Sequence, residues 1–351
     1  MILFLDLHGE ASLSARQLEA IENLAASGIN GYQFVTGTRR TLDELSREPK
    51  LSSRARSYFR KMSQQMTQVG NQIANLDRLL VTFEAPGNPD VPSISLDTFC
   101  DASYCEKTQL LAENLTDFDV LTGLSKILLA KDFRGLQLSL RAQNGGGSTT
   151  PQVLLHLAET PSGPIVCVVD SDRKFPGGAL GSTAKTTLRD LKKACDRWRV
   201  RVHVIEQREL ENILPFDLRR HCSAGLSKDL QDQLAALDAV DAFYSHYCCL
   251  KEGYSQCTMI GDLAAKRRPD LLQFARNIAY TGLPKVVACG TCQVPGGCFS
   301  SPALGKNLLQ RAALELKSNS SVTSISNWCA DLLRIINAVV VLGLAPLPQR
   351  I

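Results

Sequence analysis

The segment that most constrains the fold is a continuous apolar run, Pro164-Ile-Val-Cys-Val-Val169, followed at once by Asp170-Ser-Asp172. A strand with one solvated face alternates apolar and polar residues, whereas an unbroken apolar run is typical of a strand covered on both faces. Other predicted elements alternate around it: strands at 108–112, 136–140 and 200–205, and helices at 117–131, 151–158 and 183–198. This alternation predicts βαβ units around a parallel sheet, and therefore an α/β fold.

A smaller α/β pattern precedes this sheet. Apolar periodicity predicts strands at 2–7 and 33–35, a helix at 14–26 and a long polar helix at 54–80. Three prolines and a glycine between Glu84 and Pro92 then predict a linker.

The length of 351 residues allows two or three domains of about 150 residues each. We expect an N-terminal α/β region at 1–83, a linker at 84–103, a parallel-sheet domain at 104–220 and a helical C-terminal region at 221–351. The last region shows four helical patterns, at 229–247, 259–281, 304–316 and 327–342.

Membrane insertion and secretion are not expected. No apolar run reaches the roughly 18 residues that span a bilayer. The longest candidate, 335–347, is interrupted by Asn337 and Gly343, and it predicts a buried helix end. The N-terminal residues lack the basic segment of a secretory signal. We therefore expect a cytoplasmic protein with no membrane partner.

Acidic side chains follow three of the predicted strands. They are Glu113 with Asp117, Asp170 with Asp172, and Glu209 with Glu211. Because the carboxyl ends of parallel strands lie at one edge of a sheet, we expect these carboxylates to converge. A hard divalent cation relieves their mutual repulsion, and two such ions about 3.5–4 Å apart can drive phosphodiester cleavage.

The order of these motifs resembles that of a known family. The motifs are Glu113-Asn-Leu-Thr-Asp117, the turn Asn144-Gly-Gly-Gly147, Asp170-Ser-Asp172 and Arg208-Glu-Leu-Glu-Asn212. Residues 108–212 resemble a TOPRIM domain, as found in topoisomerases, primases and the overcoming-lysogenisation-defect nucleases. The match is to that last group and related phage-defence proteins. The first motif of the family carries a glycine where this chain has Asn114.

The resemblance implies a TOPRIM-like nuclease that uses Mg²⁺ or Mn²⁺, with two ions. Glu113 then corresponds to the general base or metal-bridging group. Three aspartates correspond to metal ligands: Asp117, Asp170 and Asp172. Glu211 corresponds to a ligand of the second metal, with Glu209 as the alternative. Related nucleases also place a lysine near the scissile phosphate, for which Lys251 is the candidate and Lys174 the rival.

The resemblance also bears on partners. Many related nucleases act with an ATPase, and this chain carries no G-x-x-x-x-G-K-[ST] motif of its own. We therefore expect a separate ATPase sensor subunit and an antiviral defence role. The alternative is a non-catalytic TOPRIM-like module that binds or regulates nucleic acid. DNA, mRNA and tRNA all remain open as substrates, and so does a homo-oligomer.

Positive charge is concentrated beside the acidic motifs. Residues 170–220 contain 12 Lys and Arg against 8 Asp and Glu, so this stretch alone equals the net charge of +4 of the whole chain. Basic residues near a metal site hold a nucleic-acid backbone, and a glycine turn lets backbone N–H groups approach a phosphate. The candidate nucleic-acid-binding residues are Gly145, Gly146, Arg173, Lys174, Lys185, Arg189 and Lys193. A plain turn and a solvated helix face are the alternatives.

Cysteines form one local cluster near the C-terminal end. Cys289-Gly-Thr-Cys292 and Cys298 place three thiols in ten residues, with Cys257 as the candidate fourth ligand and Cys249 or Cys248 as alternatives. A C-x-x-C pair matches the ligand spacing of structural Zn²⁺ sites. Either a structural Zn²⁺ or free buried thiols would account for the cluster.

Overall fold

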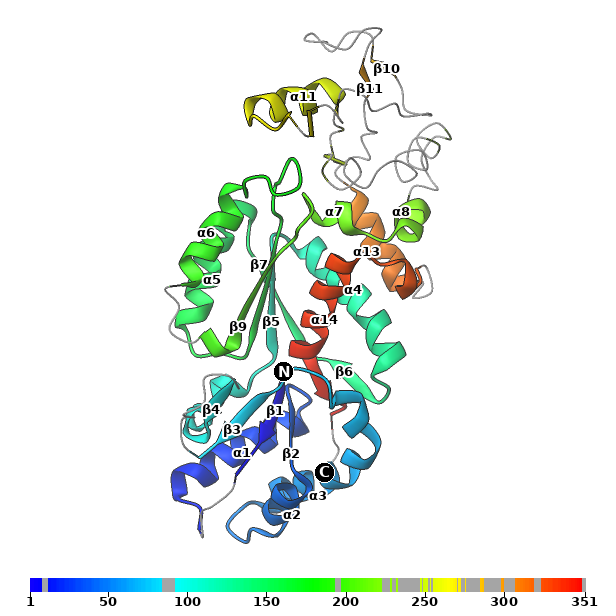
Figure 1. The fold of residues 1–351 in the computed structure, drawn as a ribbon. Helices are drawn as coiled ribbons and strands as arrows, with labels where there is room; N and C mark the ends of the chain where they lie inside the picture. The colour runs from blue at the N-terminus through cyan, green and yellow to red at the C-terminus, as the bar shows by residue number, and fades with distance from the viewer. Residues whose placement is uncertain are drawn as a thin grey trace. The chain divides into compact units, whose positions relative to one another are not determined.

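The computed structural model is a mixed α/β protein with parallel sheets (Figure 1). It describes residues 1–7, 12–83, 92–192, 197–222, 228, 232, 247, 249–251, 253, 255–269, 271–272, 275, 285–286, 298–299, 307–318 and 323–348. The chain divides into two units. The first comprises Met1–Val168, Thr187–His203 and Ile336–Ile351, and the second comprises Val169–Thr186 and Val204–Ile335.

The N-terminal residues form a four-stranded sheet in the order β2-β1-β3-β4. Its strands are β1 (Ile2–Leu5), β2 (Phe34–Gly37), β3 (Leu79–Thr82) and β4 (Ser93–Ser95). All neighbouring strands pair in parallel. The predicted α/β character of residues 1–83 is therefore confirmed, whereas the expected linker at 84–103 is wrong in part, because Ser93–Ser95 form a strand of the same sheet.

Three helices accompany this sheet: α1 (Ala15–Ile29), α2 (Arg39–Arg47) and α3 (Ser53–Ile73). Each begins after a hydroxyl side chain, Ser14, Thr38 or Ser52, that accepts a hydrogen bond from a backbone N–H of the first turn. The Tyr58 hydroxyl of α3 is buried and donates to the Val35 carbonyl of β2 at 2.7 Å.

The predicted helix at 54–80 is wrong at its C-terminal end. Helix α3 stops at Ile73, and Leu79 begins strand β3. Leu79 and Val81 are buried whereas Leu80 is half-buried, the period-two pattern of a strand. Pairing of β3 with both β1 and β4 therefore overrides the helical pattern that precedes it.

The central sheet has the order β7-β5-β8-β9. Its strands are β5 (Thr108–Ala112), β7 (Leu140–Asn144), β8 (Ile165–Val169) and β9 (Val200–Val204). Strand β5 pairs in parallel with β7 and β8, with Leu111 opposite Cys167. Every residue of β5 and β8 is buried, as expected for strands covered on both faces. The connecting helices are α4 (Leu115–Asp132), α5 (Thr150–Glu159) and α6 (Ser182–Leu191).

The predicted strand at 136–140 is split in two. Residues Leu136–Leu138 form β6, which pairs antiparallel with β12 (Leu344–Pro346), while Leu140 begins β7 in the central sheet. The predicted buried helix end at 335–347 is confirmed as far as Gly343, the last residue of α14 (Ala330–Gly343), whereas Leu344–Pro346 form β12 instead. The reason is the pairing of two short segments about 200 residues apart in sequence, which no local pattern reveals.

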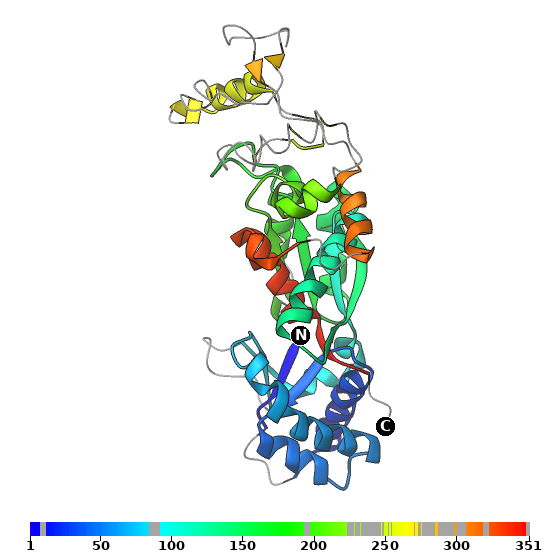
Figure 2. The ribbon, with the colours of Figure 1, turned by 90° about the vertical axis from the view of Figure 1, so that its right-hand side faces the viewer.

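The described part of the second unit is mainly helical. Its elements include α7 (Leu210–Ile213), α8 (Phe216–Cys222), α11 (Gln256–Ala265) and α13 (Leu308–Ser318), with the two-stranded pair β10 (Lys285–Val286) and β11 (Cys298–Phe299). Helices α8 and α13 lie side by side in both views (Figures 1 and 2), and His221 Nε2 is 3.1 Å from Glu315 Oε2.

The predicted helix at 259–281 differs in its bounds. Helix α11 begins at Gln256, after the N-cap Ser255, and it ends at Ala265, where Arg267 has φ of 52°. Most of the predicted helix at 229–247 lies outside the described residues. No helix in the described part of the chain is both long enough and apolar enough to cross a membrane.

Candidate functional site

The β5 acidic group consists of Glu113 and Asp117, which follow strand β5. Asn114 caps helix α4: its Oδ1 accepts from the Asp117 N–H at 3.0 Å, and its Nδ2 donates to Asp117 Oδ2 at 3.0 Å. Asp117 is only 8% exposed, so this amide holds a buried carboxylate in place. The asparagine that replaces the family's glycine therefore serves as a helix cap here.

The glycine turn after β7 is bonded to the end of β5. The Gly145 N–H donates to the Ala112 carbonyl at 2.8 Å, and the N–H groups of Gly146 and Gly147 donate to the Glu113 carbonyl at 2.9 and 3.2 Å. Gly146 and Gly147 have φ of 67° and 63°, which glycine adopts without strain. These N–H groups are thus engaged within the chain, which differs from the expectation that Gly145 and Gly146 face a phosphate.

Glu113 is half-buried, and its charge acts on the neighbouring strand. Burial raises the pKa of the Cys167 thiol of β8, and the Glu113 carboxylate adds to this effect. Cys167 pairs with Leu111, two residues before Glu113. The Glu113 carboxylate therefore lies close enough to strand β8 to act on one of its side chains.

The Lys251 cluster consists of Asp170, Glu209, Glu211 and Lys251. Lys251 Nζ lies 3.1 Å from Glu211 Oε1 and 3.7 Å from Glu209 Oε2. Glu209 and Glu211 are 7% and 1% exposed. Two buried carboxylates from helix α7 and its N-cap are thus brought against one lysine that lies 40 residues further along the chain.

Burial and charge act in opposition in this cluster. Burial raises the pKa of Glu211, and the nearby Lys251 offsets part of that rise. Burial alone would lower the pKa of Lys251, but the carboxylates of Glu211, Glu209 and Asp170 outweigh it and raise the pKa. Lys251 is therefore held charged at neutral pH, while ionisation of Glu211 is costly without a cation beside it.

The loop after β8 is tied to the loop after β9 by hydrogen bonds at three successive residues, Asp170, Ser171 and Asp172. Asp170 Oδ1 accepts from the Leu210 N–H at 2.9 Å, and the Asp172 N–H donates to the Arg208 carbonyl at 3.0 Å. The Ser171 hydroxyl donates to the Gln207 carbonyl. Asp170 is consequently fixed beside the first residue of α7, the helix that carries Glu211.

Asp172 is placed differently from Asp170. Its side chain is exposed, and its φ of 54° lies in the left-handed region, which glycine, asparagine and aspartate adopt more readily than other residues. A Cβ at Gly181 would lie 2.2 Å from Asp172 Oδ2, so only a glycine leaves room for this carboxylate. The absence of a side chain at Gly181 therefore leaves room for the exposed Asp172 carboxylate.

The donor set of the Lys251 cluster fits a hard divalent cation. Carboxylate oxygens are the protein ligands that Mg²⁺ and Mn²⁺ prefer. Glu209 Oε2 and Glu211 Oε2 are buried and lack a hydrogen-bond partner among the described residues. In the same described residues, no three His, Cys, Asp or Glu side chains are already arranged around a common metal position. Because Lys251 already pairs with both glutamates, a metal ion bound to them would displace it.

The predicted basic residues have separate surroundings. Lys174 Nζ lies 2.9 Å from Asp262 Oδ1, so the rival of Lys251 is paired outside the cluster. Arg173 is half-buried. Lys185 and Arg189 are exposed one turn apart on α6, and Arg189 Nε is 3.0 Å from Asp190 Oδ1.

Several predicted residues cannot be placed. Lys193, Cys248, Cys289 and Cys292 lie outside the described residues. Cys298 and Cys249 are buried, and Cys257 is half-buried on α11. The proposed Zn²⁺ site therefore stays a prediction, which elemental analysis of the purified chain would test.

Two residues near the acidic groups were not among the predicted site residues. Arg208 Nε lies 3.4 Å from Glu209 Oε1 and so gives this glutamate a second cation besides Lys251. Asn114 was noted only as a departure from the family motif, yet it holds Asp117. An asparagine three residues before an acidic residue at a helix start is a recognisable capping signal.

Comparison with known proteins identifies no relative: no family model, curated protein or solved structure matches this chain.

Proposed function

We propose that this chain is a divalent-metal-dependent nuclease with a TOPRIM-like core that hydrolyses phosphodiester bonds of DNA or RNA. The observation that carries the proposal is the Lys251 cluster: buried Glu209 and Glu211 beside a charged lysine, on a loop that is hydrogen-bonded to Asp170. Carboxylates with a neighbouring cation are the groups needed to bind a metal and to neutralise a phosphate.

The topology of the central sheet supports this assignment. In the order β7-β5-β8-β9, the chain runs from β5 to one neighbour, β7, and then crosses to the other neighbour, β8. This reversal makes the carboxyl ends of β5 and β8 a topological switch point, where open α/β sheets bind their ligands. Glu113 directly follows β5, and Asp170 directly follows β8.

The proposed mechanism assigns each side chain a role. Asp170, Asp172 and Glu211 would hold Mg²⁺ or Mn²⁺, which when bound lowers the pKa of water and polarises the phosphate. By the family resemblance, the Glu113 carboxylate would accept the proton of the attacking water as the new P–O bond forms. Lys251 turns from Glu211 to a non-bridging phosphate oxygen and stabilises the charge that develops as the P–O bond to the leaving oxygen breaks.

A non-catalytic nucleic-acid-binding module is the second candidate. It is favoured by the pairing of Glu209 with both Arg208 and Lys251, which neutralises that carboxylate without a metal. In this case the basic residues would bind nucleic acid while the acidic residues serve only stability. An ATPase partner and a defence role rest on the family resemblance alone.

The deciding experiment is a titration of Mg²⁺ and Mn²⁺ with the full chain, supercoiled plasmid and a structured RNA. We expect cleavage that depends on the metal and is lost in Glu211→Gln. Glu206→Gln is the matched control, because Glu206 is an exposed glutamate on the same loop. Nucleic-acid binding without cleavage at any metal concentration would favour the second candidate and refute the first.

A further inference from the structure

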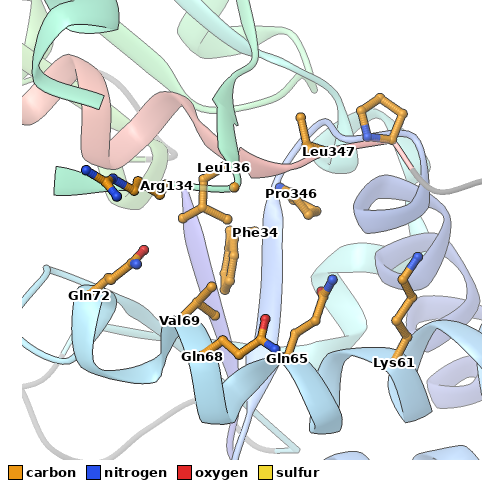
Figure 3. Close-up of a pocket in the computed structure, with 12 residues that line it drawn as sticks. Phe34, Lys61, Gln65, Gln68, Val69, Gln72, Arg134, Leu136, Pro346 and Leu347 are labelled. Carbon is orange, nitrogen blue, oxygen red and sulfur yellow. The ribbon is translucent and has the colours of Figure 1, made fainter. Parts of the chain in front are cut away.

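A pocket of about 530 Å³ lies in the first unit, and its lining includes no residue of either acidic group (Figure 3). Helix α3 forms one wall, and the opposite wall comes from residues 134–136 and from β12 with the two residues after it. A volume of this size is typical of sites that enclose a small molecule or a short stretch of a larger partner.

The charges around the pocket have one sign. Lys61 and Arg134 are exposed lining residues, and neither forms a salt bridge within the described part of the chain. The other lining residues are neutral, so no carboxylate faces these two cations across the pocket. The pocket therefore suits an occupant that carries negative charge.

The cations lie at opposite ends of the pocket. In Figure 3, Arg134 lies at the end near Gln72, and Lys61 lies at the other end. Lys61 and Gln72 are 11 positions apart on α3, which corresponds to about 16 Å along a helix axis. An extended peptide covers that length in about five residues, at roughly 3.3 Å per residue.

Amide groups line the pocket from its middle to the end near Arg134. Gln65, Gln68 and Gln72 extend from α3, and Gln72 Oε1 is enclosed without a hydrogen-bond donor among the described residues. A phosphodiester backbone offers only acceptors, whereas a peptide backbone offers an N–H at almost every residue. Gln72 Oε1, an acceptor without a donor, therefore favours a peptide backbone over a nucleic-acid backbone as the occupant.

Apolar groups complete the lining. Val69, Leu136, Pro346 and Leu347 contribute to it, and Leu347 is 55% exposed, one of the few large apolar side chains on the surface of the described residues. An apolar side chain of a partner, placed between two acidic residues, would cover this surface.

We propose that this pocket docks an extended acidic segment of a partner protein. The segment would carry two carboxylates about five residues apart, for Lys61 and Arg134, with an apolar residue between them for Val69 and Leu136. The proposal does not rest on the nuclease assignment, because none of its residues belongs to either acidic group.

The test is fluorescence anisotropy with a labelled peptide, Ser-Asp-Thr-Leu-Val-Thr-Asp-Ser, and the full chain. Lys61→Glu and Arg134→Glu should each weaken binding about tenfold, whereas Arg60→Glu, an exposed neighbour on α3 outside the pocket, should not. Gln68→Trp should block the pocket with an indole ring, and Gln64→Trp on the exposed part of the same helix is its control.

Three outcomes would overturn the proposal. The first is equal binding of a peptide with lysine at both aspartate positions. The second is an equal loss in Arg60→Glu, which would show unspecific attraction to a basic helix. The third is binding of a labelled twelve-residue oligothymidine, lost in Lys61→Glu and Arg134→Glu, with no binding of the acidic peptide. Thermal unfolding of each variant verifies that the fold is retained.

Discussion

Asp117 of the β5 acidic group and Glu211 of the Lys251 cluster are both buried carboxylates, but different kinds of group stabilise them. Asp117 accepts a hydrogen bond from Asn114, which is neutral and three residues earlier in the chain. Glu211 lies beside Lys251, a cation that only the tertiary fold brings near. The first arrangement forms whenever helix α4 forms, whereas the second exists only in the folded chain.

This difference separates a structural role from an exchangeable one. The Asn114 amide caps the N-terminus of helix α4. If a metal ion took its place beside Asp117, the helix would lose this cap and some of its stability. A lysine beside two glutamates is a cation that another cation can replace, provided that the lysine finds a new anion. We therefore propose that a metal ion would exchange with the lysine in the Lys251 cluster, whereas Asn114 holds Asp117 in place.

The largest effect is expected from the residues assigned to chemistry. Asp170→Asn and Glu113→Gln should each lower metal-dependent cleavage at least about a hundredfold, the equivalent of about 2.7 kcal/mol of transition-state stabilisation. Both changes preserve shape, so thermal unfolding should change little. Single-turnover cleavage rates of the purified variants, with Glu206→Gln as control, give the measurement. Wild-type rates in either variant would refute its assigned role.

Lys251→Ala should destabilise the fold by about 1–3 kcal/mol at pH 7, because it leaves buried carboxylates without their cation. The pKa of Glu211 is already raised by burial, and loss of Lys251 raises it further. Protonated Glu211 needs no cation, so the destabilisation should shrink as the pH falls below neutral.

Urea unfolding of Lys251→Ala at several pH values measures this effect, and Lys266→Ala, an exposed lysine of the same unit, is the control. Mg²⁺ should restore part of the lost stability in Lys251→Ala, because it replaces the missing charge. A loss that is independent of pH and of Mg²⁺ would show that Lys251 contributes only packing.

Asn114→Ala should cost about 1 kcal/mol, the usual effect of removing a helix N-cap. Unlike the effect of Lys251→Ala, this loss should respond little to added Mg²⁺, because the lost partner is neutral. Asn114→Ser retains a capping oxygen and should recover most of the stability. If Mg²⁺ rescued Asn114→Ala as well as it rescues Lys251→Ala, the two acidic groups would not differ as described.

The smallest effect is expected at Lys185, because bound nucleic acid, rather than a carboxylate of this chain, would neutralise its charge. Lys185 is exposed on α6, one turn before Arg189. Reversing both charges to Glu should flatten the slope of log K against log salt for duplex DNA by about two units. Lys126→Glu, an exposed lysine on α4, is the control. An unchanged slope would place the nucleic acid elsewhere.

The central strands could be predicted because β5 and β8 are buried on both faces and so consist of apolar runs. Strand β12 could not, because its partner β6 is distant in sequence and its apolar residues continue those of α14. Lys251 entered as a candidate through the family resemblance, since a lone lysine carries no local signal. The direction of the N–H groups in the glycine turn depends on the carbonyls of β5, and composition does not reveal it.

The hydrogen bonds between the loops after β8 and β9 also determine which sequence changes this part of the chain can accept. Each of these bonds uses a backbone group of the second loop: the Leu210 N–H and the carbonyls of Gln207 and Arg208. Side chains at those three positions can change without loss of the bonds, whereas an insertion in either loop would shift the register of all three. We therefore expect homologous chains to conserve the lengths of both loops together.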